Sequence, residues 1–273
     1  MISHRIIGIV DAFFHVRFFQ VRFFSRSIHA VINLLPDLRE RVHVDEIMDD
    51  MSITDHRLYE ALRDLRWTNR LLGGYASTRR VLAPVMDRHS RLRILDVGTG
   101  GGDSLVDLVR FGHSRGCRVE AVGIDLNPGA VEYAQRYLDQ HLSERMRQRI
   151  TVETGDALKL SYDDDSFDVA LSSLFLHHFD EAQSARVVGE MARVSRKGVL
   201  VNDLHRHPLA YLGVLLLSRL LPASDMYRHD APLSVRRGFR RRELASIASR
   251  AGIQDIDIRW HWAFRWTLFG VTN

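Results

Sequence analysis

A cluster of glycines follows a short apolar run in the stretch RILDVGTGGGD, residues 93–103. A strand that ends in glycines commonly cradles an anionic or nucleotide-like ligand, because no Cβ keeps the backbone amides away from it. Gly98, Gly100 and Gly102 give the spacing G-x-G-x-G, whereas the dinucleotide fingerprint is G-x-G-x-x-G. Asp103 stands where the third fingerprint glycine would be, and a carboxylate at a helix start would repel a pyrophosphate. The spacing therefore disfavours a dinucleotide.

Acidic residues near the ends of three apolar runs suit a ligand made of a nucleoside and an amino acid. Asp96 can face an ammonium group, and Asp125, 27 residues after Gly98, can accept hydrogen bonds from both ribose hydroxyls. Asp156 can accept a hydrogen bond from an adenine amino group. S-adenosylmethionine has these groups and no phosphate, so we expect it as the cofactor. Because dinucleotide enzymes also place an acid at the ribose, an NAD-dependent oxidoreductase is the alternative, opposed by Asp103.

Four segments resemble the consecutive motifs of class I S-adenosylmethionine-dependent methyltransferases: ILDVGTGGGD, VGIDLNPGAVEYA, ETGDALKL and DDDSFDVALSSLFLHHF. They occur in order, and the resemblance covers about residues 90–203. It implies a methyltransferase in which the glycine turn lies at the methionine moiety, the second motif at the ribose and the third at the adenine. The candidate cofactor residues are Asp96, Gly98, Thr99, Gly100, Gly102, Asp125, Leu126, Asp156, Ala157 and Ser173.

Histidines follow the fourth and fifth strand-like runs. Methyl transfer from a sulfonium needs an aligned nucleophile and a group that removes its proton, and histidine is the usual base near neutral pH. LFLHH places His177 and His178 just past the fourth run, and NDLHRH places His205 past the fifth. Adjacent residues in regular structure cannot both point into one pocket, so one of the first two is expected to be structural. We favour His177 as the base, with His178 and His205 as the other candidates.

Two other kinds of site are weighed and disfavoured. Some quinone-pathway O-methyltransferases carry acidic metal ligands after the fourth strand, but LFLHH contains no carboxylate, so we expect no metal despite the ligand-like spacing of His205 and His207. The stretch RRGFRRRE, residues 236–243, has five arginines around one aromatic residue. Base-modifying relatives usually carry Asn-Pro-Pro-aromatic after the fourth strand, and this chain has SSLF instead. We therefore expect no nucleic-acid partner.

The segment HPLAYLGVLLLSRLL, residues 207–221, is almost wholly apolar. It could be a buried core helix. In the resembling architecture, however, an insertion after the fifth strand, here about residues 205–240, covers the substrate pocket. The segment is similar to methyltransferases of polyketide-derived phenols and of quinone rings, which implies a small hydrophobic acceptor methylated on oxygen or carbon. A non-catalytic protein on the same fold is a further alternative, and the complete cofactor motifs oppose it.

Alternation of strand-like and helical patterns from residue 89 onward predicts a Rossmann-like, mainly parallel seven-stranded sheet with helices on both faces. A helix over 241–253 precedes two strand-like runs, 255–262 and 264–271, which are too close together to pair in any way but antiparallel. Residues 41–88 are predicted to form a helical cap. Its first helix is expected to begin with a capping box, SITD at 52–55, and to place Leu58, Leu62 and Leu65 on one face.

The bulk composition of the 273 residues is that of an ordinary globular protein, with a net charge of +4. The single cysteine, Cys117, excludes an internal disulfide and suits a reducing cytoplasm. Residues 1–40 are apolar and basic, but charges interrupt them too often for a membrane-spanning helix. Three interpretations stay open for this extension: a helix packed on the core or on the partner of a homodimer, an interfacial helix in peripheral contact with a membrane, or a non-native stretch before a start at Met48.

Overall fold

The computed structural model describes residues 36–272. Residues 1–35 of the extension predicted over 1–40 lie outside that range. By its internal contacts the chain divides into two compact units, residues 1–40 and residues 41–273, and the fold below is that of the second unit. Among the described residues, no helix combines the length and the apolar character needed to cross a bilayer.

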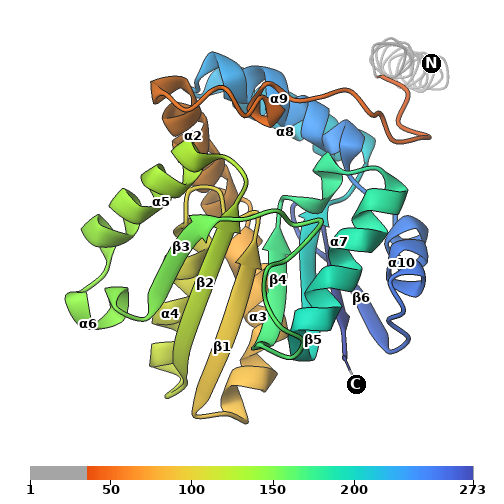
Figure 1. Ribbon diagram of the computed structural model, residues 1–273. Helices are drawn as coiled ribbons and strands as arrows, with labels where there is room; N and C mark the ends of the chain where they lie inside the picture. Colours follow the sequence, from red (N-terminus) through yellow and green to blue (C-terminus); the bar gives the residue numbers. More distant parts are fainter. Residues whose placement is uncertain (1–35, 273) are drawn as a thin grey trace, which may run out of the picture. The chain divides into compact units, whose positions relative to one another are not determined.

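A seven-stranded sheet forms the centre of this unit (Figure 1). The strand order is β3-β2-β1-β4-β5-β7-β6, and β1 to β5 run parallel. β7 lies antiparallel between β5 and β6, which confirms the predicted sheet and its terminal hairpin. The strands are β1 (Arg91–Val97), β2 (Arg118–Asp125), β3 (Ile150–Thr154), β4 (Phe167–Ser173), β5 (Ser195–Leu204), β6 (Ile256–His261) and β7 (Arg265–Gly270).

Helices cover both faces of the sheet, because the central strands are apolar on both sides. Alternate residues of β1 belong to different core clusters: Leu95 packs in one and Ile94 in the other. The first cluster includes residues of α7 (Glu181–Val194) and α10 (Arg241–Arg250), and the second includes residues of α3 (Gly74–Asp87), α4 (Asp103–Ser114) and α5 (Pro128–His141). A short helix, α6 (Glu144–Arg147), precedes β3.

The helical segment before the sheet begins later than predicted. α2 spans His56–Leu71, and the carboxylate of Asp55 accepts a hydrogen bond from the Arg57 amide at 3.0 Å. The capping box starting at Ser52 is therefore wrong: the Ser52 hydroxyl donates to Asp50 at 2.6 Å, which leaves Asp55 as the N-cap. Leu58 faces the core as predicted, and Leu72 and Gly73 separate α2 from α3, which begins at Gly74.

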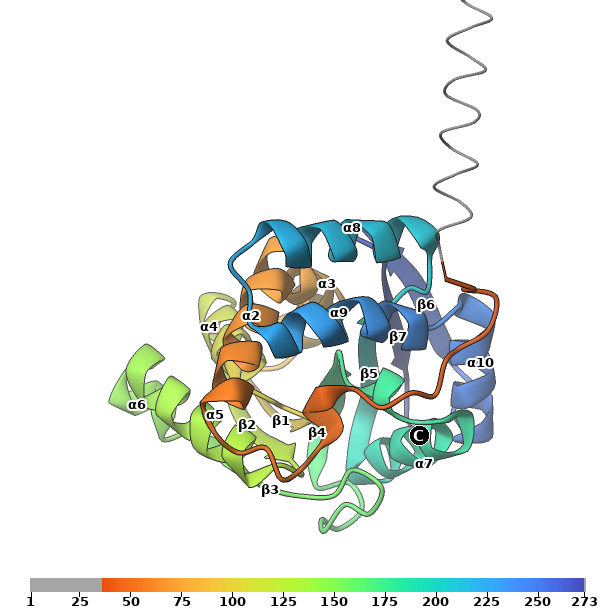
Figure 2. The same cartoon turned by 90° about the horizontal axis from the view of Figure 1, so that it is seen from above.

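Two helices follow β5 in the predicted insertion, α8 (Pro208–Leu220) and α9 (Asp225–Arg237). They pack against each other, and α9 also contacts α2. α8 and α9 lie above the sheet in Figure 1 and side by side in Figure 2. Only Ala210 and Ser218 of α8 are buried, while Leu216 and Leu220 are exposed. The apolar segment is therefore not a core helix, and its leucines are available to cover a site at the sheet's edge.

Candidate active site

The glycine turn after β1 has a backbone that requires glycine. Gly98 has φ 71° and Gly100 has φ 51°, both in the left-handed region that residues with a Cβ seldom adopt. A Cβ on Gly98 would lie 2.1 Å from the ring of Phe175. The Gly100 amide donates to Asp125 Oδ2 at 2.9 Å, so the turn is tied to the end of β2.

A cavity of about 480 Å³ opens at the carboxyl ends of β1 to β4. Eight of the ten predicted cofactor residues line it: Gly98, Thr99, Gly100, Asp125, Leu126, Asp156, Ala157 and Ser173. The other two, Asp96 and Gly102, do not. Asp96 is buried beneath the turn and accepts hydrogen bonds from Thr99 at 2.8 Å and from Ser104. Asp96 therefore stabilises the turn, and the prediction that it faces the ammonium group of the ligand is wrong.

The walls of this cavity are acidic. Of the residues that the structure describes, five aspartates line it, and Arg66 is the one lysine or arginine there. Burial raises the pKa of both Asp125 and Asp103; Asp103 also accepts a hydrogen bond from Tyr75. A pyrophosphate would meet repulsion at such walls, whereas a sulfonium and an ammonium group would be attracted. The donor set and charge therefore fit S-adenosylmethionine.

A second cavity, of about 370 Å³, lies beneath α8 and α9. Its walls are mainly apolar and include side chains from both helices and from the β6–β7 hairpin. Four residues line both cavities: Met48, Leu65, Leu174 and His178. Leu174 has φ 55°, a conformation that is uncommon for leucine and is often found at functional sites. The two cavities therefore adjoin, and the second has a volume typical of small-molecule sites.

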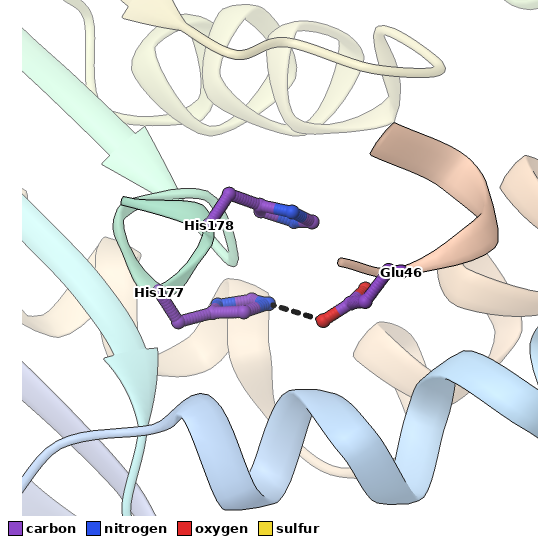
Figure 3. A group of neighbouring side chains, drawn as sticks. All are labelled: Glu46, His177 and His178. Atoms are coloured by element: carbon purple, nitrogen blue, oxygen red, sulfur yellow. Dashed lines mark ion pairs between the residues drawn. The ribbon is translucent and has the colours of Figure 1, made fainter. Parts of the chain in front are cut away.

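Both histidines of the LFLHH segment reach the second cavity. Leu176–His178 forms a single 3₁₀ turn, η2, and the two imidazole rings lie 4.4 Å apart, tilted by 31°. Figure 3 shows both rings directed toward Glu46. The expectation that neighbouring histidines cannot share a pocket is therefore wrong here. It assumed regular structure, and in a 3₁₀ turn consecutive side chains need not point to opposite sides.

His177 is paired with a buried carboxylate. Its Nδ1 lies 2.7 Å from Oδ1 of Asp203 on β5, and its amide donates to Oδ2 of the same residue at 3.2 Å. Burial alone would raise the pKa of Asp203, but the charge and hydrogen bond of His177 outweigh it and hold that pKa below its usual value. An ionised Asp203 places the imidazole proton on Nδ1 and leaves the Nε2 lone pair free.

Nε2 of His177 faces Glu46, 3.6 Å from its Oε1. Glu46 is buried and accepts a hydrogen bond from Ser234 at 2.9 Å. Burial raises the pKa of Glu46 to about 7, although nearby His178 and Arg237 act in the opposite direction. The site thus contains a carboxyl group that exchanges a proton near neutral pH.

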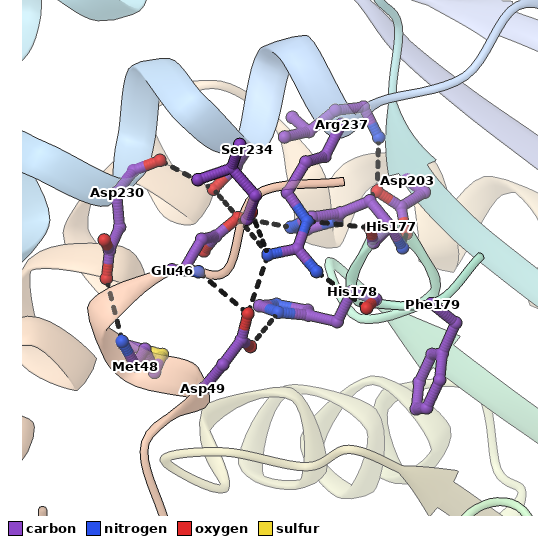
Figure 4. A network of polar contacts seen from close by, with 12 residues as sticks. Glu46, Met48, Asp49, His177, His178, Phe179, Asp203, Asp230, Ser234 and Arg237 are labelled. Atoms are coloured by element: carbon purple, nitrogen blue, oxygen red, sulfur yellow. Dashed lines mark hydrogen bonds and ion pairs between the residues drawn. The ribbon is translucent and has the colours of Figure 1, made fainter. Parts of the chain in front are cut away.

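Arg237 holds the histidine turn in place (Figure 4). Its Nε donates to the His177 carbonyl at 3.1 Å, and its Nη2 to the His178 carbonyl at 2.6 Å. Its Nη1 donates to Asp49 at 2.6 Å, and Asp49 in turn lies 2.5 Å from Nδ1 of His178. These contacts orient both rings from behind the turn.

His205 is not part of this arrangement. It lines neither cavity, and its ring packs against His207, at 5.2 Å, and Trp266, at 5.0 Å. Burial, followed by the neighbouring positive groups, lowers the pKa of His205 to about 4. The prediction that His205 is a catalytic base is therefore corrected, because the side chain packs among aromatic rings away from the ligand space.

Glu46, His177 and His178 could also hold a metal ion, since one ligand atom from each lies within 4.8 Å of the others. The sequence argument against a metal relied on the absence of a carboxylate near the histidines, and Glu46 removes that argument. The contacts of the carboxylate weigh against a cation nonetheless. The same Oε1 accepts a hydrogen bond from Ser234 and lies 3.9 Å from the Arg237 guanidinium. A metal ion at this oxygen would have to displace the hydrogen bond and would be repelled by the arginine.

Part of the arginine-rich stretch 236–243 is directed into the protein, although Arg241 and Arg242 are exposed. Phe239 is fully buried and Arg237 is 4% exposed. These two side chains therefore belong to the interior, and Arg237 to the site. Sequence reasoning missed Arg237, Glu46 and Asp49, because no local pattern links residues that lie about 60 to 130 positions from the histidine turn to it.

The sheet with its antiparallel β7, the glycine turn and the acidic cavity at the carboxyl ends of the strands define a class I S-adenosylmethionine-dependent methyltransferase. A family described as a methyltransferase domain matches residues 94–198. A demethylmenaquinone methyltransferase of Roseiflexus sp. (strain RS-1) is 30% identical over 218 residues, 71% of this chain and 86% of the relative. The chain belongs to the S-adenosylmethionine-dependent methyltransferases.

Two further comparisons agree with this assignment. The 27-O-demethylrifamycin SV methyltransferase of Amycolatopsis mediterranei (strain S699) is 30% identical over 155 residues, 51% of this chain and 53% of the relative. Human N-acetylserotonin methyltransferase in complex with its cofactor shares the fold with a TM-score of 0.56 at 18% identity, covering 80% of this chain and 56% of that one. When bound, S-adenosylmethionine supplies a methyl group on an electrophilic sulfonium, and the residues of the acidic cavity would hold it.

Proposed function

We propose that this enzyme methylates an oxygen or a ring carbon of a small hydrophobic acceptor, of phenolic, polyketide or quinone-like type, held in the second cavity. The observation that carries the proposal is the apolar cavity that adjoins the cofactor cavity and has His177 in its wall. The names of the two relatives support the acceptor class, since one is named for demethylmenaquinone and the other for 27-O-demethylrifamycin SV.

The acceptor cavity has mainly apolar walls and few polar groups that could bind a ligand. Leu209, Val214 and Leu217 of α8 form one wall, and Trp260 and Trp262 near the β6–β7 turn form another. Flat aromatic and aliphatic surfaces of this kind bind ring systems mainly through burial of apolar area. Acceptor orientation is then left to the polar groups at the cavity's edges.

His177 is the proposed general base. Its Nε2 takes the proton of the acceptor hydroxyl or acidic carbon, and Asp203 stabilises the imidazolium that forms. Glu46, 3.6 Å from Nε2, receives that proton in turn, because burial raises its pKa to about 7 and so lets the carboxyl group hold a proton near neutral pH. His178, which lines both cavities, is the alternative base and otherwise forms part of the wall between cofactor and acceptor.

The expectations about residues 1–40, which include a homodimer and peripheral contact with a membrane, stay predictions. The acceptor proposal does not depend on them. It depends only on residues of the second unit and on the cavity that α8 and α9 cover.

Filling the second cavity tests the proposal. Gly213 on α8 lines that cavity, and a Cβ built there meets nothing within 4 Å, so Gly213→Leu adds volume without a backbone clash. We expect this variant to weaken binding and methylation of phenolic acceptors by at least about tenfold while its affinity for S-adenosylhomocysteine is unchanged. The matched control is Gly189→Leu on α7, which is equally open but lines neither cavity. Equal acceptor kinetics in the two variants would contradict the proposal.

A further inference from the structure

A buried arginine that has no side-chain hydrogen-bond partner within the described part of the chain lies in the wall of the acceptor cavity. Arg265 is the first residue of β7, is 2% exposed and lines the second cavity. Its Nε and Nη1 are buried and have no hydrogen-bond partner among residues 36–272. Within that same range no ion pair joins Arg265 to a carboxylate.

The other deeply buried arginines are compensated by carboxylates. Arg206 pairs with Glu243 at 2.6 Å, and Arg237 pairs with Asp49 at 2.6 Å. This contrast matters because a buried charge is costly unless it is paired and hydrogen-bonded. Among these three arginines, Arg265 alone has no carboxylate paired with it within residues 36–272.

Neighbouring acids do not supply the missing partner. Asp203 is the carboxylate that acts on Arg265 through space, but burial outweighs it and lowers the pKa of Arg265 to about 10, so the side chain is still a cation at neutral pH. The Asp203 oxygens already accept hydrogen bonds from His177 and from the Leu204 amide. Asp203 therefore acts as the partner of His177, and Arg265 forms no hydrogen bond or ion pair with it within the described residues.

Asn69 is another polar group nearby that is unpaired within residues 36–272. Its Oδ1 has no donor among the described residues. Asn69 and Arg265 both lie against Gly74: a Cβ on that glycine would be 1.7 Å from Asn69 Oδ1 and 3.0 Å from Arg265 Cζ. Asn69 carries no charge, so even a rearranged contact with Arg265 would leave the cation without a counter-ion.

We propose that Arg265 is the counter-ion for a carboxylate of the acceptor, so that the substrate is an apolar ring compound that carries an acidic group. This inference rests on the proposed function, because it takes the second cavity as the acceptor site. A guanidinium binds a carboxylate through paired N–H donors in a fixed geometry. Arg265 thereby determines both the class of acceptor and its orientation, with the acid at β7 and the reacting atom toward His177.

Calorimetric titration tests this with two matched probes, 6-hydroxy-2-naphthoate and its uncharged analogue 6-hydroxy-2-naphthamide, in the presence of saturating S-adenosylhomocysteine. We expect the full-length protein to bind the naphthoate at least about tenfold more tightly, as a charge-assisted hydrogen bond in a buried site provides. Arg265→Met should abolish that preference, and Arg265→Lys should retain part of it. Equal affinities in the unchanged protein, or a preference that survives in Arg265→Met, would overturn the assignment.

Thermal unfolding of the ligand-free protein provides an independent readout. If Arg265 has no partner in the protein, Arg265→Met should leave Tm unchanged or raise it, because an uncompensated buried charge is replaced by an apolar side chain of similar length. Arg206→Met, which breaks the pair with Glu243, is the control and should lower Tm. A fall in Tm for Arg265→Met as well would assign Arg265 a structural role. Failure of both probes to bind would count against the acceptor cavity itself, and the Tm comparison would still decide the role of Arg265.

Discussion

The buried carboxylate of Glu46 makes the stability of the protein depend on pH in a direction that can be measured. Burial raises its pKa from 4.5 to about 7. The folded protein therefore holds this proton more tightly than the unfolded chain does, and between about pH 4.5 and pH 7 the free energy of unfolding falls as pH rises. The rise in pKa corresponds to about 3 kcal/mol of lost stability once the pH exceeds 7.

Glu46→Gln removes this titration with little change in shape, and the amide oxygen can still accept the hydrogen bond from Ser234. We expect the variant and the unchanged protein to be about equally stable near pH 4.5, and the variant to be more stable by up to about 3 kcal/mol at pH 8. Urea unfolding at pH 4.5, 6, 7 and 8 measures the difference. Other buried acids such as Asp96 titrate in both proteins, so their contributions cancel in the comparison.

Glu60→Gln is the matched control, because Glu60 is exposed on α2, and it should leave the pH dependence unchanged. If Glu46→Gln is less stable than the unchanged protein at pH 8, the reasoning is refuted. The Arg237 guanidinium, 3.9 Å away, would then hold Glu46 ionised, and Glu46 could not receive a proton from His177 near neutral pH.

Three further predictions concern the site. Asp203→Asn should lower kcat by at least about 100-fold with unchanged affinity for S-adenosylhomocysteine, because the amide no longer fixes the proton of His177 on Nδ1. A stopped assay measures the turnover, and near-normal turnover would contradict the pairing of His177 with Asp203. Asp125→Ala should weaken S-adenosylhomocysteine binding about 10- to 100-fold by calorimetry, since two ribose hydroxyls lose a charged acceptor; unchanged affinity would place the ribose elsewhere. Dialysis against EDTA should leave turnover unchanged, because Glu46 is occupied by Ser234 and lies beside Arg237; loss of turnover that zinc or magnesium restores would show a metal at the histidine turn.

The fold and most of the cofactor residues could be predicted from the sequence because they follow local patterns. The glycine turn, the acid at the end of β2 and the alternation of strands and helices each lie within a few residues of the signal that indicates them. The antiparallel hairpin could also be predicted, since the short connection between β6 and β7 permits no other pairing. Asp96 shows where this approach fails, because its direction beneath the turn depends on Thr99 and Ser104.

The catalytic arrangement could be predicted only in part. LFLHH indicated histidines at the correct edge of the sheet, but the 3₁₀ turn that lets both reach one cavity is set by tertiary contacts from Arg237. Glu46 lies 131 positions before His177, and no periodicity carries such a pairing. Arg265 resembles an ordinary strand residue in the sequence, and only its burial without a partner distinguishes it.

Transfer of an isotope-labelled methyl group tests the central claim most directly. The protein would be incubated with methyl-labelled S-adenosylmethionine and a panel of phenols, hydroxynaphthoates and reduced naphthoquinones, and the labelled products identified by mass spectrometry. The account predicts label on one of these apolar acceptors, and a rate at least about 100-fold lower in His177→Ala at unchanged affinity for S-adenosylhomocysteine. Label that appears only on nucleic acid or protein substrates, or full turnover by His177→Ala, would contradict it.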